Sequence, residues 1–239
     1  DQEMSRGLGD VYKRQAFYVP AVILFLNSIP GVRERDFSNL EVLLYGASPI
    51  SEDVLLTAKD IFKCKFIQVY GLTETCGAGT ILEPEDHDPS LGRLRSCGKV
   101  APTAELKIVD SKGNSLGPNE VGEITYRSKS VMKGYWKNEE ATKKSISSGW
   151  FSTGDAGYLD ADGYLYIHDR IKDMIVSGGE NVYPAEVENA LFDHPAIGDV
   201  AVIGVPDDKW GEAVKAVVVL KPGAEAVSYT HLRAHETSP

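Results

Sequence analysis

The stretch Leu40–Thr75, LEVLLYGASPISEDVLLTAKDIFKCKFIQVYGLTET, decides how the first part of this 239-residue chain folds. Its apolar run Leu40–Tyr45 predicts a buried strand, and Phe66–Tyr70 predicts a second one. Between them, Ser51 is suited to cap a helix that runs to about Phe62, because acidic residues follow it in the first turn. A strand, a helix and a strand in this order predict a βαβ unit with parallel strands.

Both predicted strands end in a turn that contains glycine, at Gly46 and at Gly71. Ligands of parallel sheets gather at the carboxyl ends of the strands, so we expect the two turns to line one site. Gly71 allows a sharp turn, from which the hydroxyl of Thr73 and the carboxylate of Glu74 project. Such hard oxygen ligands suit Mg²⁺ bound together with phosphates. Taken alone, however, a Thr-Glu-Thr turn is more often a solvated loop.

Composition and charge narrow the classes of function. The net charge of −10 argues against nucleic acid as a partner, because nucleic-acid binding relies on clustered Lys and Arg. No apolar run approaches the roughly 18 residues of a membrane span. The three cysteines, Cys64, Cys76 and Cys97, show no CxxC spacing. They favour neither a disulfide framework nor a zinc site, and we expect a cytoplasmic protein.

The rest of the chain has a different pattern of predicted secondary structure. The region of about Leu91–Arg170 is rich in strand and turn signals, including a hairpin at Asp162-Gly163, and predicts a compact antiparallel or barrel-like unit. A short helix is expected within it at Glu139–Ser145, after Asn138. From Ile171 the predicted order is strand, helix, strand and strand, which is an α+β arrangement. The chain as a whole is therefore expected to combine α/β and α+β parts.

Two further motifs carry side chains with possible chemistry. Asp155 follows a glycine in Ser-Thr-Gly-Asp, and its carboxylate could accept both hydroxyl protons of a ribose diol. Arg170 and Lys172 lie in Asp-Arg-Ile-Lys-Asp, at the boundary between the β-rich region and the α+β region. At this boundary Arg170 could bind a nucleotide and Lys172 could act as a hinge. Each motif alone is compatible with an ordinary turn or a solvated linker.

Together and in this order, the motifs resemble those of the adenylate-forming enzymes: acyl-CoA synthetases, adenylation domains of nonribosomal peptide synthetases and beetle luciferases. The matching stretches are Gly46–Ser48, Tyr70–Thr75, Gly122–Ile124, Ser152–Asp155 and Asp169–Asp173. The resemblance covers essentially all of residues 16–226. It implies the C-terminal part of a large AMP-binding domain at 16–170 and a truncated small domain at 171–226.

The resemblance also implies where a nucleotide would lie. Gly46, Ala47 and Ser48 would lie beside the adenine. Tyr70 and Gly71 would line the region between the adenine and the carboxylate of the acyl group.

For the remaining side chains, the resemblance implies contacts with the phosphate, the metal and the ribose. Thr73 would contact the phosphate of the adenylate, and Glu74 would hold Mg²⁺. Asp155 would bind both ribose hydroxyls with the assistance of Arg170, and Lys172 would occupy the hinge of the small domain.

The expected reaction needs ATP, Mg²⁺ and CoA. In the first step a carboxylic acid, which the resemblance suggests is a fatty acid, reacts with ATP to give an acyl-adenylate and pyrophosphate. In the second step the acyl group is transferred to CoA, giving acyl-CoA and AMP. Gly178 and Gly179 would belong to a loop that reaches the site for thioester formation, where a side chain would obstruct the pantetheine. An aryl-acid ligase, a peptide-synthetase adenylation domain and a non-catalytic nucleotide-binding remnant remain alternatives, and the oligomeric state is open.

The two ends of the chain differ from the rest. Back-translation of residues near the start and near the end allows one DNA oligonucleotide to encode both, on opposite strands, like a sequencing adapter. We therefore expect residues 1–15 and 227–239 to be adapter-derived. We also expect an internal fragment that lacks the family's phosphate loop and its late catalytic lysine and is therefore inactive. Because the sheet of its large domain would be incomplete, we expect unpaired strand edges, exposed apolar surface and a poorly soluble product.

Overall fold

The computed structural model describes residues 14–77, 79–192, 194–221 and 223–224. The chain divides into two compact units between Ile167 and His168, and each is described by itself. Residues 227–239, which we expect to be adapter-derived, lie outside the described residues, as do residues 1–13 of the other expected adapter segment. Arg14 and Gln15 are described, and Gln15 begins a strand in which it pairs with Val42.

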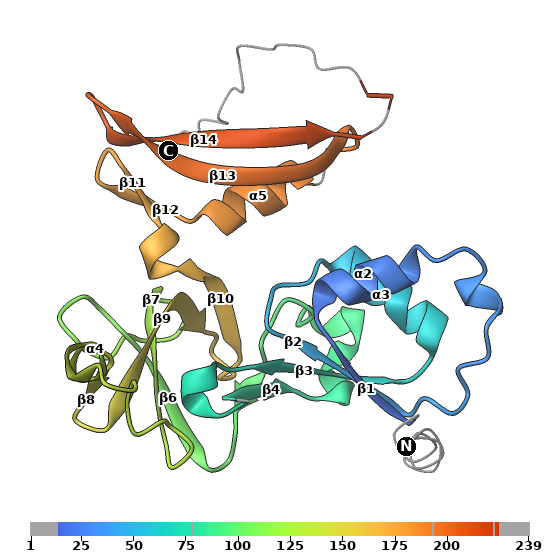
Figure 1. The fold of residues 1–239 in the computed structure, drawn as a ribbon, viewed down its shortest axis with the longest axis horizontal. Helices are drawn as coiled ribbons and strands as arrows, with labels where there is room; N and C mark the ends of the chain where they lie inside the picture. Colours follow the sequence, from blue (N-terminus) through green and yellow to red (C-terminus); the bar gives the residue numbers. More distant parts are fainter. Residues whose placement is uncertain (1–13, 78, 193, 222, 225–239) are drawn as a thin grey trace. The chain divides into compact units, whose positions relative to one another are not determined.

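The first unit contains a five-stranded sheet in the order β1-β2-β3-β4-β5. Its strands are β1 (Gln15–Tyr18), β2 (Val42–Gly46), β3 (Lys65–Tyr70), β4 (Thr80–Leu82) and β5 (Lys99–Val100). The first three are parallel, which confirms the predicted βαβ unit, and the last two are antiparallel additions. Helices α2 (Pro20–Asn27) and α3 (Glu52–Phe62) lie on one face of this sheet (Figure 1).

Helix α3 begins and ends where its sequence predicts. The hydroxyl of Ser51 accepts a hydrogen bond from the backbone N–H of Val54, and Lys63 ends the helix with a φ of 49°. The helix buries one apolar stripe against the sheet. The buried core on this side of the sheet consists of Ile23, Val32, Leu43, Tyr45, Leu55, Ala58, Ile61, Phe62, Phe66 and Leu94.

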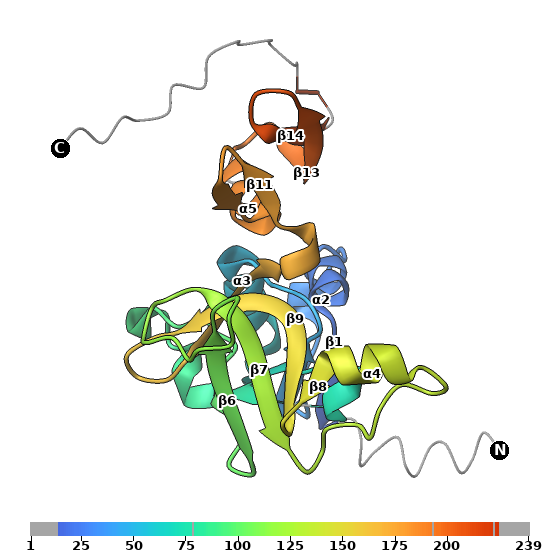
Figure 2. The same ribbon diagram turned by 90° about the vertical axis from the view of Figure 1, so that its left-hand side faces the viewer.

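The β-rich region forms an antiparallel sheet in the order β10-β9-β7-β6, with β8 paired to β9. Its strands are β6 (Ala104–Val109), β7 (Gly122–Ser128), β8 (Ile146–Ser147), β9 (Trp150–Leu159) and β10 (Leu165–Arg170). Strands β6, β7 and β9 run side by side (Figure 2). Helix α4 (Glu139–Ser145) begins after Asn138, whose side chain accepts the N–H of Ala141, as the sequence predicts.

Strand β9 contains an irregularity that the sequence analysis read as a turn. Opposite β7, Ser152 pairs with Thr125 and Ala156 pairs with Glu123, so three residues of β9 face the single residue Ile124. Because β9 is paired with β7 both before and after this point, Asp155 lies in a β-bulge within a strand and not in a turn between elements. The φ of Gly154 in this bulge is 74°.

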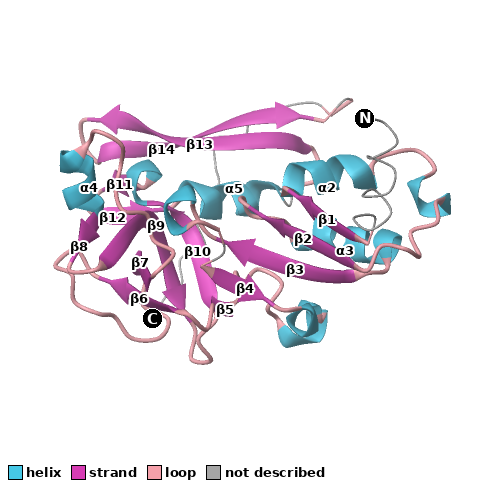
Figure 3. Ribbon diagram, turned by 60° about the horizontal axis from the view of Figure 1, so that its bottom comes forward, coloured by secondary structure: helices cyan, strands magenta, loops and turns pink. Residues whose placement is uncertain are grey.

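The second unit is a four-stranded antiparallel sheet in the order β12-β11-β14-β13 with one helix. Its elements are β11 (Ile175–Ser177), β12 (Glu180–Val182), α5 (Pro184–Phe192), β13 (Ile197–Asp207) and β14 (Gly211–Leu220). The last two strands form a long pair (Figure 3). Strand β12 was not predicted; it forms because Gly178 and Gly179, both at positive φ, close a two-residue turn after β11.

Short 3-10 helices complete the description, at Val32–Glu34, Thr73–Thr75, Pro84–His87, Pro89–Leu91 and Ile171–Asp173. Across the described part of the chain, no helix has the length and apolar character needed to cross a membrane.

Candidate functional site

The turn after β2 combines a buried glycine with an exposed, strained backbone. A Cβ atom on Gly46 would lie 2.1 Å from the carbonyl oxygen of Val69 on the neighbouring strand, so no side chain fits there. Ala47 follows with a φ of 69°, a conformation that costs energy for a residue with a side chain. Ala47 and Ser48 are both exposed, so this turn presents backbone atoms and small side chains at the end of the sheet.

The turn after β3 depends on a close approach rather than on an unusual glycine conformation. A Cβ atom on Gly71 would lie 1.7 Å from the carbonyl oxygen of Gly77, whereas its φ is outside the left-handed region. The chain turns back here, as predicted, and glycine is required by the contact between two backbone segments and not by a positive φ.

Thr75, which the sequence analysis assigned no role, closes this turn. Its buried hydroxyl accepts the N–H of Leu72 at 3.0 Å and lies 2.9 Å and 3.0 Å from the carbonyl oxygens of Leu72 and Gly77. Cys76 then takes a φ of 54°. The only signal in the sequence is a hydroxyl at the end of Thr-Glu-Thr, which is typical of many turns.

Thr73 and Glu74 lie in the 3-10 helix that Thr75 closes. Thr73 is exposed, and Glu74 is half-buried. The Oε1 atom of Glu74 accepts a hydrogen bond from the hydroxyl of Tyr135 at 2.9 Å, and its backbone oxygen accepts the N–H of Met132 at 2.7 Å. A segment far along the chain therefore holds the carboxylate that the sequence analysis singled out.

Tyr70 and Asp155 are brought together from motifs that are 85 residues apart. The hydroxyl of Tyr70, at the end of β3, donates to Oδ2 of Asp155 at 2.7 Å. Asp155 is only 4% exposed. Burial, with the negative charge of Asp155 as the next cause, raises the pKa of Tyr70, so this phenol stays protonated as a donor.

The bulge in β9 aims Asp155 at this point. The hydroxyl of Thr153 donates to the carbonyl oxygen of Ile124 at 2.7 Å and accepts the N–H of Asp155 at 3.1 Å. The side chain of Thr153 thus replaces a ladder contact that the bulge interrupts. Nearby, burial raises the pKa of Cys97 to about 12, so this thiol is protonated and unreactive at neutral pH.

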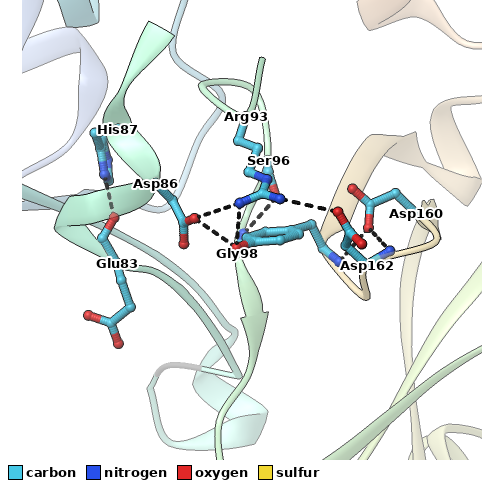
Figure 4. Close-up of polar contacts among 9 residues, drawn as sticks. Glu83, Asp86, His87, Arg93, Ser96, Gly98, Asp160 and Asp162 are labelled. Atoms are coloured by element: carbon cyan, nitrogen blue, oxygen red, sulfur yellow. Dashed lines mark hydrogen bonds and ion pairs between the residues drawn. The ribbon is translucent and has the colours of Figure 1, made fainter. Parts of the chain in front are cut away.

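A polar cluster that the sequence analysis missed joins the two sheets of the first unit (Figure 4). Arg93 donates to Oδ1 of Asp86 at 3.1 Å, to the hydroxyl of Tyr164 at 3.0 Å and to Oδ2 of Asp162 at 3.1 Å. The hydroxyl of Tyr164 also donates to Asp86 at 2.7 Å. The cluster connects the segment after β4 to the turn between β9 and β10, and no local pattern in the sequence indicates it.

His87, next to this cluster, is fully buried. Its Nδ1 lies 2.8 Å from the carbonyl oxygen of Glu83, and its Nε2 lies 3.0 Å from the hydroxyl of Tyr45. Burial lowers the pKa of His87. A neutral ring that donates from Nδ1 and accepts at Nε2 satisfies both contacts, so His87 is part of the core.

The other predicted site residues belong to the second unit. Arg170 ends β10, and Lys172, whose side chain is 73% exposed, lies 3.9 Å from Asp173. A Cβ atom on Gly178 would lie 2.6 Å from the ring of Trp210, and nothing crowds Gly179.

A metal ion at this site would need ligands from outside the protein. The described ranges contain no group of three or more His, Cys, Asp or Glu side chains that could hold a metal ion. Glu74 offers a carboxylate, with Thr73 beside it. One carboxylate is sufficient for Mg²⁺, which keeps several waters and takes its other ligands from bound phosphates. The donor set therefore fits Mg²⁺ delivered with a nucleotide.

Two curated proteins are similar in sequence to most of this chain. The fatty acid–[acyl-carrier-protein] ligase ScoC of Streptomyces coeruleorubidus is 43% identical over 210 residues, which are 88% of this chain and 40% of that protein. The medium/long-chain-fatty-acid–CoA ligase FadD8 of Mycobacterium tuberculosis is 43% identical over 206 residues, 86% of this chain and 36% of that protein.

A solved structure shows the same similarity in three dimensions. The o-succinylbenzoate coenzyme A synthetase MenE of Bacillus subtilis, in complex with ATP and a magnesium ion, has a TM-score of 0.77 at 36% identity. The match covers 92% of this chain and 44% of that chain. Our chain therefore spans less than half the length of the relatives that it matches.

Family models match both units. The AMP-binding enzyme family matches residues 13–136, and the AMP-binding enzyme C-terminal domain matches residues 186–237. The first match alone covers more than half of the chain. Together with the identity to ScoC and the structural similarity to MenE, this match shows that the chain belongs to the AMP-binding enzyme family of adenylate-forming acid ligases.

Proposed function

We propose that this chain is part of a ligase that activates a carboxylic acid with ATP, forming an acyl-adenylate and pyrophosphate, and then transfers the acyl group to CoA with release of AMP. The observation that carries the proposal is the hydrogen bond between Tyr70 and Asp155. This bond connects the turn after β3, which is suited to bind phosphate and metal, with a buried carboxylate that is suited to bind a diol. Phosphate and ribose diol are groups of the same nucleotide, so the two parts could bind one ligand.

The nucleoside end of AMP would lie at the turn after β2 and at the bulge of β9. The Asp155 carboxylate would accept hydrogen bonds from the two ribose hydroxyls, while Tyr70 fixes its orientation. Gly46 keeps the end of β2 close to β3, and Ala47 and Ser48 would flank the adenine. Support comes from the exposure of Ala47 and from its unfavourable φ, since strain of this kind is concentrated at ligand sites.

The phosphate end would lie at the turn after β3. Thr73 would donate its hydroxyl to the α-phosphate, Glu74 would hold Mg²⁺, and Gly71 would leave room for the carboxylate of the acid. Bound Mg²⁺ would neutralise part of the charge on the phosphate oxygens. In the adenylation step the acid's carboxylate oxygen attacks the α-phosphorus, and the bond to the pyrophosphate oxygen breaks.

The second unit would serve the transfer step. Arg170 would assist Asp155 at the ribose, Lys172 would be the hinge, and Gly178 and Gly179 would give the pantetheine of CoA a path. The CoA thiol loses its proton and attacks the acyl carbon, and AMP leaves with the bonding electron pair. The region of residues 16–170 would then act as the AMP-binding part and 171–226 as the mobile part.

The acid is proposed to be a fatty acid, because ScoC and FadD8 are both named for fatty acids. An aryl acid is the second candidate, favoured by the similarity to MenE and to a feruloyl-CoA synthase of Amycolatopsis that is 40% identical over 208 residues. ScoC is named for an acyl-carrier-protein acceptor, which makes a carrier protein the alternative to CoA. A panel of fatty and aryl acids, scored by acid-dependent pyrophosphate release, separates the two acids.

The first test is nucleotide binding by the full 239-residue chain. We expect AMP to bind about tenfold more tightly than 2′-deoxy-AMP by calorimetry, because one good hydrogen bond to a charged group has about that value. Asp155→Asn should remove the preference, whereas Glu85→Gln, an exposed carboxylate outside the site, should keep it. Equal binding of both nucleotides to the wild-type chain would contradict the role of Asp155.

A further inference from the structure

We infer that Tyr135 is a positioning residue that makes Glu74 a one-oxygen metal ligand and thereby favours Mg²⁺ over Ca²⁺. The inference rests on the proposed function, in which Glu74 holds the metal. It assigns a role to a residue outside the motifs that the sequence analysis singled out.

Two contacts from one segment fix Glu74. The hydroxyl of Tyr135 donates to Oε1 at 2.9 Å, and the N–H of Met132 donates to the backbone oxygen of Glu74 at 2.7 Å. No hydrogen bond or ion pair reaches Oε2 from the described part of the chain. The two oxygens of this carboxylate are therefore unequal: Oε1 accepts a hydrogen bond from Tyr135, and Oε2 accepts none within the described ranges.

The segment that carries Tyr135 is itself held in place. The backbone N–H of Tyr135 donates to Oγ1 of Thr142 at 2.9 Å, and that hydroxyl donates to the carbonyl oxygen of Asn138 at 2.8 Å. A Cβ atom on Gly134 would lie 2.7 Å from Thr142, so the chain runs directly over helix α4. The phenol is thus presented from a backbone anchored on a helix, and it restricts Glu74 before any ligand binds.

The unequal oxygens have a consequence for the choice of metal. Ca²⁺ commonly takes both oxygens of a carboxylate, whereas Mg²⁺ requires octahedral geometry and takes one oxygen from each of one or two carboxylates. The proton that Tyr135 donates competes for electron density on Oε1 and disfavours two-oxygen binding. Loss of this hydroxyl should weaken the Mg²⁺ complex and favour the Ca²⁺ complex.

The test compares Mg²⁺ with Ca²⁺ as the metal that supports ATP binding to the full 239-residue chain, measured by calorimetry. The variants are Tyr135→Phe, Glu74→Gln and Tyr18→Phe; the last removes a hydroxyl that makes no hydrogen bond within the described ranges. We expect Tyr135→Phe to reduce the preference for Mg²⁺ about tenfold, the lower end of the effects of residues that orient metal ligands. Metal-free AMP binding should stay unchanged, and Tyr18→Phe should behave as wild type.

The outcomes separate this inference from the proposed function. An unchanged preference in Tyr135→Phe, with metal dependence lost in Glu74→Gln, overturns the inference and leaves the proposed function intact. Metal dependence that persists in Glu74→Gln, or that is absent from the wild-type chain, overturns the proposed metal role of Glu74 and the inference with it. If Tyr135→Phe fails to give the wild-type thermal transition, Thr142→Val replaces it, because it releases the backbone of Tyr135 and should shift the preference in the same direction.

Discussion

Two tyrosine hydroxyls hold carboxylates in the first unit, and they do so in opposite surroundings. Tyr70 donates to Asp155 at 2.7 Å across two sheets, and the carboxylate is 4% exposed. Tyr135 donates to Glu74 at 2.9 Å on the surface, where Tyr135 is 37% exposed. The two bonds have the same chemistry and similar lengths, so differences in their effects come from their surroundings.

The buried pair is costly to break and therefore fixes geometry. In a low-dielectric interior a lost partner leaves an acceptor without compensation, whereas on the surface water replaces it. The Tyr70–Asp155 bond should contribute to the stability of the fold. The Tyr135–Glu74 bond should contribute little to stability and much to the orientation of one side chain.

The largest effect should come from Gly71→Ala, which disturbs both pairs because Gly71 lies between Tyr70 and Glu74. The added Cβ would lie 1.7 Å from a backbone oxygen that cannot rotate away. We expect a loss of about 3 kcal/mol or more in the free energy of unfolding, measured with urea. Gly117→Ala is the matched control, since its Cβ meets only the flexible end of Glu120. Equal losses in both variants would exclude the close approach as the cause.

The next effect is that of Tyr70→Phe, which keeps the ring and removes the donor to Asp155. We expect a loss of about 2 kcal/mol in the free energy of unfolding, because a buried charged acceptor loses one partner. Tyr18→Phe in the same unit should change stability by less than about 0.5 kcal/mol. A similarly small change in Tyr70→Phe would mean that the buried pair does not differ from the exposed one.

The pH dependence sharpens the same contrast. Burial raises the pKa values of both Tyr70 and Tyr45 above the ordinary value of 10.0. Above about pH 10 the unfolded chain releases these protons while the folded chain keeps them, so stability is complete below pH 10 and falls as the pH rises. Each phenol contributes at most about 1.4 kcal/mol per pH unit. Urea unfolding between about pH 9 and pH 11 should show a shallower decline in Tyr70→Phe.

Arg93→Met tests whether the cluster of Arg93, Asp86, Asp162 and Tyr164 supports the strand that carries Asp155. The change keeps an unbranched apolar stem and removes the guanidinium with its three hydrogen bonds. We expect faster amide exchange of Cys97, whose N–H donates to the carbonyl oxygen of Leu165 at 2.7 Å, and of Leu165, whose N–H donates to the carbonyl oxygen of Gly98 at 2.8 Å. Exchange in helix α3 should stay as in the wild type. Uniform acceleration across the unit would indicate global destabilisation instead.

The smallest effect on stability should be that of Tyr135→Phe. Its hydroxyl bonds to a half-buried carboxylate that water can solvate, so we expect a change below about 0.5 kcal/mol in the free energy of unfolding. The same variant should shift the metal preference, as described above. A large loss of stability with an unchanged metal preference would reverse the contrast between the two tyrosines.

Much of the local structure followed from the sequence. The βαβ unit, the cap at Ser51 and helix α4 after Asn138 were predicted correctly, because apolar periodicity and capping residues act over a few positions. Strands β4 and β5 were missed, since segments of three and two residues have no measurable period.

The site was only partly predictable. The ordered motifs indicated Tyr70, Glu74 and Asp155, but not the contacts that orient them. The Tyr135–Glu74 bond spans 61 residues, and the Arg93–Tyr164 bond spans 71. Such pairs are set by tertiary packing, and a tyrosine or an arginine in a loop has no pattern that distinguishes it from an ordinary surface residue.

The bulge in β9 has a consequence for how this strand could change in length during evolution. Side chains of a strand alternate between its two faces, so a one-residue insertion or deletion moves every following residue to the wrong face. Residues 153–155 oppose Ile124 alone, which is an excess of two, and the alternation is the same on both sides of the bulge. A change of two residues at this point therefore keeps the buried and exposed faces of β9 as they are.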